Sequence, residues 1–241
     1  MHPFWKRVFE PLFPYHPRFL QHKKKFIKMG GNVTHLYPIL SDYKHEAGLA
    51  YGHYFHQDLL VASYIYQRNP KRHIDIASRI DGFVAHVATF REIEILDIRK
   101  LQDTGHDNIK FIQADLMSKN NLGLSDSISC LHAIEHFGLG RYGDPIDPNG
   151  HKKAFKNLLE TLSPLGYLYI GVPIGKDNEV HFNAHRVFHP LDILTWGEPD
   201  TYDLTQFDFV DDEGKIHKNI NIQNTKINVN YGCGIYTLKK K

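Results

Sequence analysis

The stretch RHIDIAS at residues 72–78, followed by RIDGFVAHVATF at residues 79–90, decides the fold. Its first part is a short apolar run that ends in small and polar residues, which is typical of a buried strand. Its second part favours a helix near residues 82–90. A strand that leads directly into a helix predicts the start of a βαβ unit.

The same alternation continues along the chain. Because strands that alternate with helices pair in parallel, the pattern predicts an α/β fold with a Rossmann-like, mostly parallel sheet. Near the C-terminus, FDFVDD and CGIYTLK are expected to pair as an antiparallel edge. The expected strands are 72–78, 93–98, 110–115, 127–133 and 167–173, the edge segments are 207–212 and 233–239, and a second helix is expected at 150–162.

Composition narrows the class of protein. Of 241 residues, 41% are hydrophobic and 23% are charged, which excludes collagen-like, disordered and coiled-coil chains. With 29 basic residues against 27 acidic ones, we expect no nucleic acid partner. Two cysteines are too few for a disulfide framework, and no apolar stretch approaches the ~20 residues of a membrane span, so a cytoplasmic location is expected.

Residues 1–70 are expected to form an N-terminal helical arm and lid, and residues 71–241 the α/β domain. Residues 1–30 hold seven basic side chains against Glu10 alone, interleaved with aromatic ones. The spacing of Phe4, Val8 and Leu12 predicts a short amphipathic helix that Pro14 and Pro17 interrupt. Two interpretations stay open: peripheral contact with an anionic membrane surface, or a helix that caps the domain.

The segment YGHYFHQDLLVA at residues 51–62 precedes the first strand. Its histidines, His53 and His56, stand with Gln57 ahead of an apolar helical stretch. A lid over the ligand pocket and ordinary core packing are the two interpretations of this segment.

Polar residues follow the predicted strands. In open α/β sheets the ligand lies beyond the carboxyl ends of the strands, so these residues are candidates for binding. Asp75, Ser78 and Gly82 form the first turn. Asp97 comes 22 residues after Asp75, which suits a hydrogen bond from a ribose hydroxyl. Asp115 is placed to contact an adenine ring.

These strand ends, together with SPLGYLYIGVP at 163–173, resemble the class I S-adenosylmethionine-dependent methyltransferases over residues 72–173. The resemblance implies S-adenosylmethionine as cofactor, held by the five residues of the strand ends. The first turn departs from the family pattern, because Ala77, Ser78 and Arg79 stand where the family shows a G-x-G-like sequence.

A narrower resemblance rests on the strings GHYFHQDLLVA, LHAIEHFGLGRYGDPIDPNGH and FNAHRVFHP. They look like a methyltransferase-like family of unknown function that is associated with bacterial surface-polysaccharide gene clusters. This resemblance implies a glycan or sugar-nucleotide substrate and a place in polysaccharide biosynthesis.

His132, Glu135 and His136 form an H-x-x-E-H pattern, which inverted zinc proteases use on a helix. Here the preceding SISCL is a predicted strand, so no metal is expected. The pair Glu135–His136 instead matches the E-H pair that methyltransferases commonly carry after the fourth strand. We expect His136 to be the catalytic base, with His181 and His185 as rivals.

The loop GLGRYGDPIDPNG at residues 138–150 should lie at the ligand end of the sheet. Arg141, Tyr142 and Asp144 are the expected contacts with substrate. Three interpretations of Asp144 and Asp147 stay open: substrate contact, Asx-turns that close the loop, or ligation of a hard cation such as Mg²⁺.

The segment HFNAHRVFHP spaces His181, His185 and His189 four residues apart. We expect only His185 and His189 to be neighbours on a helix. Three roles of these histidines stay open: metal binding, substrate binding or general-base catalysis, and packing. Arg186 is expected to hold an anionic acceptor.

Two functions follow. The first is transfer of a methyl group from S-adenosylmethionine to an oxygen of a sugar, a sugar nucleotide or a glycan precursor. The second is a protein with the same fold that does not methylate. It would serve a glycan pathway by binding a sugar or by catalysing another reaction, with or without a metal. The altered first turn motivates the second.

Overall fold

The computed structural model describes residues 16–119, 121–198 and 200–241, and the chain divides into two compact units, 1–49 and 50–241. The predicted helix over Phe4–Leu12 lies outside the described residues. In the first unit, helix α2 (Pro17–Lys28) begins at a proline, which is favoured at the first helical position. A short turn, η2 (Asp42–Lys44), follows it.

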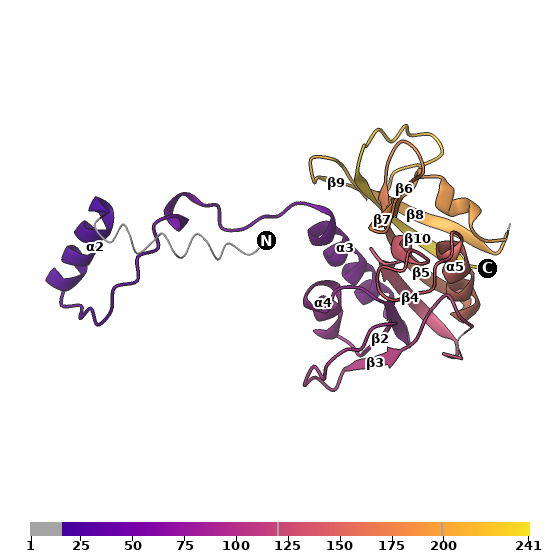
Figure 1. Cartoon of the computed structure of the whole chain (residues 1–241), viewed down its shortest axis with the longest axis horizontal. Coiled ribbons are helices and arrows are strands. Elements are labelled where there is room, and N and C mark those ends of the chain that lie inside the picture. Colours follow the sequence, from indigo (N-terminus) through magenta and orange to yellow (C-terminus); the bar gives the residue numbers. More distant parts are fainter. Residues whose placement is uncertain (1–15, 120, 199) are drawn as a thin grey trace. The chain divides into compact units, whose positions relative to one another are not determined.

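The second unit is built on an eight-stranded sheet with the order β3-β2-β1-β4-β5-β10-β8-β9 (Figure 1). The first five strands in that order are parallel, and β10 runs antiparallel to both β5 and β8. The predicted fold class is confirmed. The strands are β1 (His73–Ile76), β2 (Ile93–Asp97), β3 (Ile109–Gln113), β4 (Ser125–Leu131), β5 (Leu162–Ile174), β8 (Tyr202–Val210), β9 (Ile216–His217) and β10 (Gly232–Lys240).

Two apolar cores lie on the two faces of this sheet. On one face, α3 (His53–Arg68) and the pair formed by η3 (Ile80–Val84) and α4 (Ala85–Ala88) pack side chains such as Val61 and Phe83 against Ile95 of β2. On the other face, α5 (Gly150–Thr161) packs Phe155 and Leu158 with the sheet. Since α3 contributes to a sheet core, it belongs to the second unit, and the expected boundary after residue 70 falls inside that unit.

The order of the strands reverses between β1 and β4. On one side of β1 lie β2 and then β3, the next two strands in the sequence. The strand after them, β4, pairs with the other side of β1. At such a reversal, the connections leave in opposite directions and open a crevice at the carboxyl ends of the two strands. Any ligand site of this fold is therefore expected beyond Ile76 and Leu131.

The segment after β5 differs from the expectation. His185 and His189 are not helical neighbours: β6 (Glu179–His181) and β7 (His185–Val187) form a two-stranded hairpin in which His181 is paired with His185. The reason is a long-range contact, because Phe188 exchanges backbone hydrogen bonds with the end of β5, through Pro173 and Gly175. Two further short turns are η4 (Ile134–His136) and η5 (Asp192–Thr195).

Within the described ranges, no helix has the length and apolar character needed to cross a membrane.

Candidate functional site

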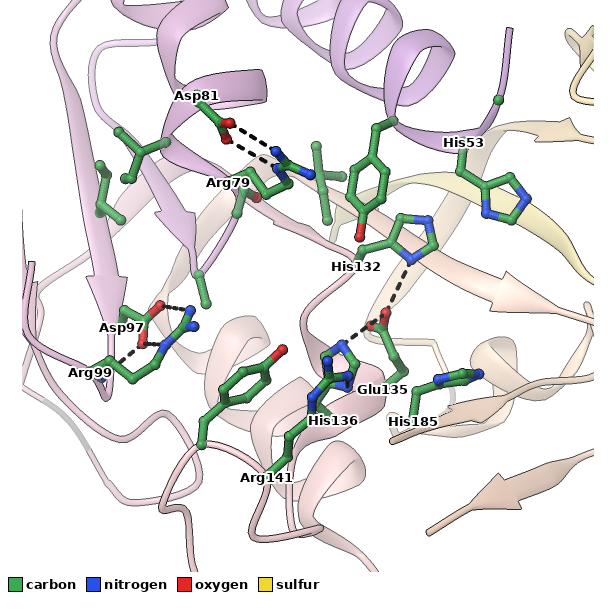
Figure 2. Close-up of a pocket in the computed structure, with 18 of the residues that line it drawn as sticks. His53, Arg79, Asp81, Asp97, Arg99, His132, Glu135, His136, Arg141 and His185 are labelled. Atoms are coloured by element: carbon green, nitrogen blue, oxygen red, sulfur yellow. Dashed lines mark hydrogen bonds and ion pairs between the residues drawn. The ribbon is translucent and has the colours of Figure 1, made fainter. Parts of the chain in front are cut away.

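A cavity of about 1150 Å³ opens at the carboxyl ends of β1, β2 and β4 (Figure 2). The turn at Asp211–Gly214, the start of α3 and Tyr231 close its other sides. A smaller cavity adjoins it between the ends of β2 and β3, and the two share Asp97, His136 and Tyr142. The site thus lies at the strand-order reversal.

The first turn is shaped by Asp75. This carboxylate is fully buried and accepts hydrogen bonds from the Ser78 backbone N–H (3.0 Å), the Ser78 hydroxyl (2.7 Å) and the Ser129 hydroxyl (2.5 Å). Burial raises the pKa of Asp75 to about 6, although these hydrogen bonds oppose the rise. Of the residues expected to bind cofactor here, Ser78 lines the cavity, whereas Asp75 supports the turn from behind.

The backbone of this turn compensates for its unusual sequence. Ala77 has a φ of 54°, in the left-handed region that favours glycine. An alanine held there costs roughly 1–2 kcal/mol relative to its preferred conformations. The turn therefore adopts the backbone conformation that glycine favours, although residue 77 is an alanine. Gly82 lies behind the turn, where an added Cβ would come within 2.7 Å of Asp58 Oδ2.

Asp97 lies at the end of β2 and faces both cavities. Arg99 donates to it three times, through its backbone N–H (2.8 Å), Nε (3.0 Å) and Nη2 (2.6 Å). Since a carboxylate has about four acceptor positions, one stays open toward a ligand. The Arg99 guanidinium also stacks 4.3 Å above the Tyr142 ring. Asp115 lines the smaller cavity and accepts a hydrogen bond from the Met117 backbone.

Glu135 joins two histidines inside the cavity wall. Its Oε1 accepts a hydrogen bond from His132 Nδ1 (3.1 Å) and lies 3.6 Å from His136 Nε2 (Figure 2). His136 Nδ1 is 2.6 Å from the carbonyl oxygen of Ala184. A carbonyl only accepts, so Nδ1 carries the proton and Nε2 keeps a lone pair. Burial lowers the pKa of His136, which keeps this ring neutral near pH 7.

The Gly-rich loop after η4 presents two of its expected substrate contacts to the cavity, Arg141 and Tyr142. Asp144 lines the smaller cavity and closes the loop, because its carboxylate accepts from the Gly138 (2.7 Å) and Gly140 (3.2 Å) backbone N–H groups. The Asx-turn interpretation holds for Asp147, which accepts from the Asn149 backbone N–H two residues on (2.8 Å), whereas Asp144 closes the loop through amides that precede it. Gly138 has a φ of 81°, and a Cβ there would lie 1.9 Å from the carbonyl oxygen of Asp147, so only glycine fits.

Arg186 is buried beneath the same loop rather than at the cavity. Its guanidinium donates to the carbonyl oxygens of Phe137 (2.7 Å) and Glu135 (3.2 Å), so it fixes the backbone that carries the Glu135–His136 pair. His185 lines the cavity from β7, with its ring 6.4 Å from that of His136. His181 is exposed at the hairpin, where it pairs with Glu179 (2.6 Å).

Sequence reasoning missed one part of the site. His53 stacks on His132 with ring centroids 5.5 Å apart and an angle of 1° between the planes, and Tyr231 packs 5.6 Å from His53. Burial and the charge of His132 lower the pKa of His53 to about 4. Cys233 stands close behind them. The local sequence signals were the histidine at the start of α3 and a cysteine between two glycines, but nothing linked them.

Unsatisfied polar atoms gather in this cavity. In the part of the chain that the structure describes, five buried side-chain nitrogen or oxygen atoms lack a hydrogen-bond partner, and three of them belong to cavity residues: His132 Nε2, Glu135 Oε2 and His185 Nε2. Native structures rarely leave such atoms unpaired. Their concentration indicates a site that a ligand completes.

A family model described as "Caenorhabditis protein of unknown function, DUF268" matches residues 78–227. No curated protein matches the chain. The structure is similar to the N-methyltransferase NodS of Bradyrhizobium japonicum in complex with S-adenosylhomocysteine, with 11% identity over 78% of this chain and 88% of that one and a TM-score of 0.52.

Two further structures illustrate the range of similar proteins. An S-adenosylmethionine-dependent methyltransferase from Clostridium acetobutylicum is 12% identical over 92% of this chain and 99% of that one, with a TM-score of 0.53. The cyclase SpnF is 12% identical over 76% and 81%, with a TM-score of 0.55. Similarity at such low identity shows the fold, which is the Rossmann-like fold of class I methyltransferases.

Proposed function

This chain belongs to the DUF268 family, and from that premise we propose that it is an S-adenosylmethionine-dependent methyltransferase acting on an oxygen of a sugar, a sugar nucleotide or a glycan precursor. The observation that carries the proposal is the arrangement of the large cavity. The first turn and Asp97 face it from one side, and the Glu135–His136 pair faces it from the other.

The residues on the first side fit the cofactor. The left-handed turn at Ala77 leaves its backbone at the cavity wall, and the open acceptor position of Asp97 suits a ribose hydroxyl. The smaller cavity continues from Asp97 toward Asp115 between apolar side chains, as an adenine ring requires. When bound, S-adenosylmethionine supplies an electrophilic methyl group.

The residues on the second side fit proton removal. Methyl transfer to a hydroxyl needs alignment of the acceptor oxygen and a base for its proton. His136 Nε2 has a lone pair and faces Glu135 Oε1, which is also an acceptor, at 3.6 Å. Because both atoms are acceptors, they form no hydrogen bond with each other. A substrate hydroxyl placed between them would donate its hydrogen bond to one of the two. We assign His136 as the base, with His185 as the rival that also lines the cavity.

The acceptor is proposed to carry a negative charge as well as hydroxyl groups. Arg141 lines the cavity beside His136. Its Nη1 donates to the Ala184 carbonyl oxygen (2.9 Å) and lies 3.4 Å from His136 Nδ1, which leaves its Nε and Nη2 donors for a ligand. Lys100 lines the same cavity, and so does Arg79, which forms an ion pair with Asp81 (2.8 Å). Guanidinium groups bind phosphate strongly, which favours a sugar nucleotide among the three acceptor classes.

The test is a transfer assay with methyl-labelled S-adenosylmethionine and a panel of nucleotide sugars and free sugars. We expect label in a sugar product, and we expect His136→Ala to lower turnover by about 10²–10⁴-fold. His106→Ala, which changes an exposed loop histidine outside the cavity, is the matched control and should transfer at the wild-type rate. Absence of labelled product across the panel, with the cofactor bound, counts against sugar methylation.

A second candidate function is a glycan-pathway protein that does not methylate. The alanine in the first turn favours it, and the similarity to the cyclase SpnF shows that this fold is compatible with other chemistry. Under this function, nucleotide sugars would stabilise the chain against heat while S-adenosylmethionine and S-adenosylhomocysteine would not. Stabilisation by S-adenosylhomocysteine alone would contradict it.

A further inference from the structure

Three metal-binding side chains meet at the wall of the large cavity. The candidate ligand atoms of His53, His132 and Cys233 all lie within 4.8 Å of one another. They come from three separate segments: the first residue of α3, the residue after β4 and the second residue of β10. Two imidazoles and one thiol form a donor set that zinc and related transition metals prefer.

His132 is oriented as a ligand. In its neutral form it donates from Nδ1 to Glu135 and has a lone pair on Nε2, and that atom is buried without a hydrogen-bond partner. The side chain is only 6% exposed. Metal-binding histidines typically donate their other ring N–H to a carboxylate in this way. His132 also has a φ of 50°, a strained conformation of the kind that is concentrated at functional sites.

Cys233 supplies the sulfur donor. Its side chain is fully buried, and its Sγ lies 3.5 Å from Gln57 Oε1. The Gln57 amide N–H donates to Asp58 Oδ1 (3.2 Å), so its oxygen faces the sulfur and accepts the hydrogen bond from the thiol. A bound metal ion stabilises the thiolate form of a cysteine ligand.

We propose that His53, His132 and Cys233 bind one divalent transition-metal ion, best suited to zinc, with a fourth coordination position open to the cavity. His53 and His132 line the cavity and Cys233 does not, so the ion would sit between the thiolate and the cavity space. Three protein ligands and one open position are the pattern of catalytic rather than structural zinc.

The role of the ion rests on the proposed function. An acceptor hydroxyl that occupies the open position would have its pKa lowered by the metal, and His136 would then take its proton. This metal site differs from the zinc interpretation of the H-x-x-E-H pattern. Glu135 orients a ligand here, and His136 is not part of the cluster.

The test measures metal binding by the full chain after treatment with a chelator. We expect titration to reach one Zn²⁺ per chain by mass spectrometry of the metal, and we expect the Co²⁺ form to show thiolate-to-cobalt charge-transfer absorption. Cys233→Ser should abolish that absorption, and Cys130→Ser, which changes the other buried cysteine, should keep it. His53→Ala, at a partly exposed helix start, should weaken Zn²⁺ binding at least tenfold without loss of fold.

Sub-stoichiometric metal, or a Cys233→Ser protein that keeps the charge-transfer absorption, would overturn the site. Calorimetry with S-adenosylhomocysteine on the same samples separates this proposal from the proposed function. Metal binding without S-adenosylhomocysteine binding would support the site and refute the methyltransferase. Binding of S-adenosylhomocysteine by a chain that takes up no metal would refute the site alone.

Discussion

His132 and Glu135 form a buried pair in which Nδ1 of the histidine donates to Oε1 of the glutamate at 3.1 Å. Both side chains are almost inaccessible, at 6% and 2% exposure. The same oxygen lies 3.6 Å from His136 Nε2, so one carboxylate connects the proposed metal ligand with the proposed base. This connection makes Glu135 a residue whose substitution should affect both.

We expect Glu135→Gln to weaken Zn²⁺ binding about 10–100-fold, because a neutral amide is a weaker acceptor for the His132 N–H. Competition with a coloured chelator measures the affinity. Glu160→Gln, on the exposed side of α5, is the control and should leave it unchanged. Equal affinities in both variants would contradict the orienting role of Glu135.

The rate of methyl transfer should depend on pH through His136. Burial lowers the pKa of this residue below 6.5, and the base must be unprotonated. The rate should therefore be constant near neutral pH and fall as the pH drops through a midpoint below 6.5. Initial rates between pH 5 and pH 8 give the profile, and a midpoint above 6.5 would point to another base.

Ala77→Gly should stabilise the protein by about 1 kcal/mol, because glycine adopts the left-handed φ of this turn without strain. Ala85→Gly, at a helical position with a φ of −60°, is the matched control and should destabilise by roughly 1 kcal/mol. Urea denaturation of both variants measures the free energies of unfolding. Destabilisation of similar size in the two variants would mean that Ala77 is not strained.

Of the two open interpretations of the basic N-terminal arm, contact with anionic membranes and capping of the domain, the membrane contact can be tested directly. Helix α2 carries Lys25 and Lys28 in its last turn and exposes Phe26 and Ile27. Vesicles that contain phosphatidylserine should bind the full chain, and reversal of both lysines to glutamate should abolish co-sedimentation, since each basic residue contributes about 1 kcal/mol. Lys152→Glu is the control. Equal sedimentation with neutral vesicles would exclude an electrostatic contact.

Much of the fold was predictable, because buried parallel strands leave a strong local signal. The strand predicted at 93–98 is β2, and the helix predicted at 150–162 is α5. The strand predicted at 110–115 is β3, which begins one residue earlier, at Ile109. The histidine spacing at 181–189 was misleading, since a four-residue repeat of one residue type does not record which backbone partners are available. There, pairing with β5 decided the conformation.

The site was predictable in part. Asp97, His136 and Arg141 reach the cavity because their positions follow from the strand ends. Arg186 hydrogen-bonds to loop backbone instead, and Asp144 lines the smaller cavity with a carboxylate that also accepts from loop backbone. Polar residues that hold a loop and polar residues that hold a ligand look alike in sequence. The group of His53, His132 and Cys233 was not predictable, because its members come from distant segments and meet only when β10 inserts beside β5.

The most direct test of the account is isothermal titration calorimetry with S-adenosylhomocysteine on the full chain and on Asp97→Asn. The account predicts one ligand per wild-type chain and roughly 10–100-fold weaker binding by the variant, which loses a charged acceptor. Asp107→Asn, in an exposed loop, should bind like the wild type. No binding by the wild-type chain, or equal affinity in wild type and Asp97→Asn, would contradict the proposed cofactor site.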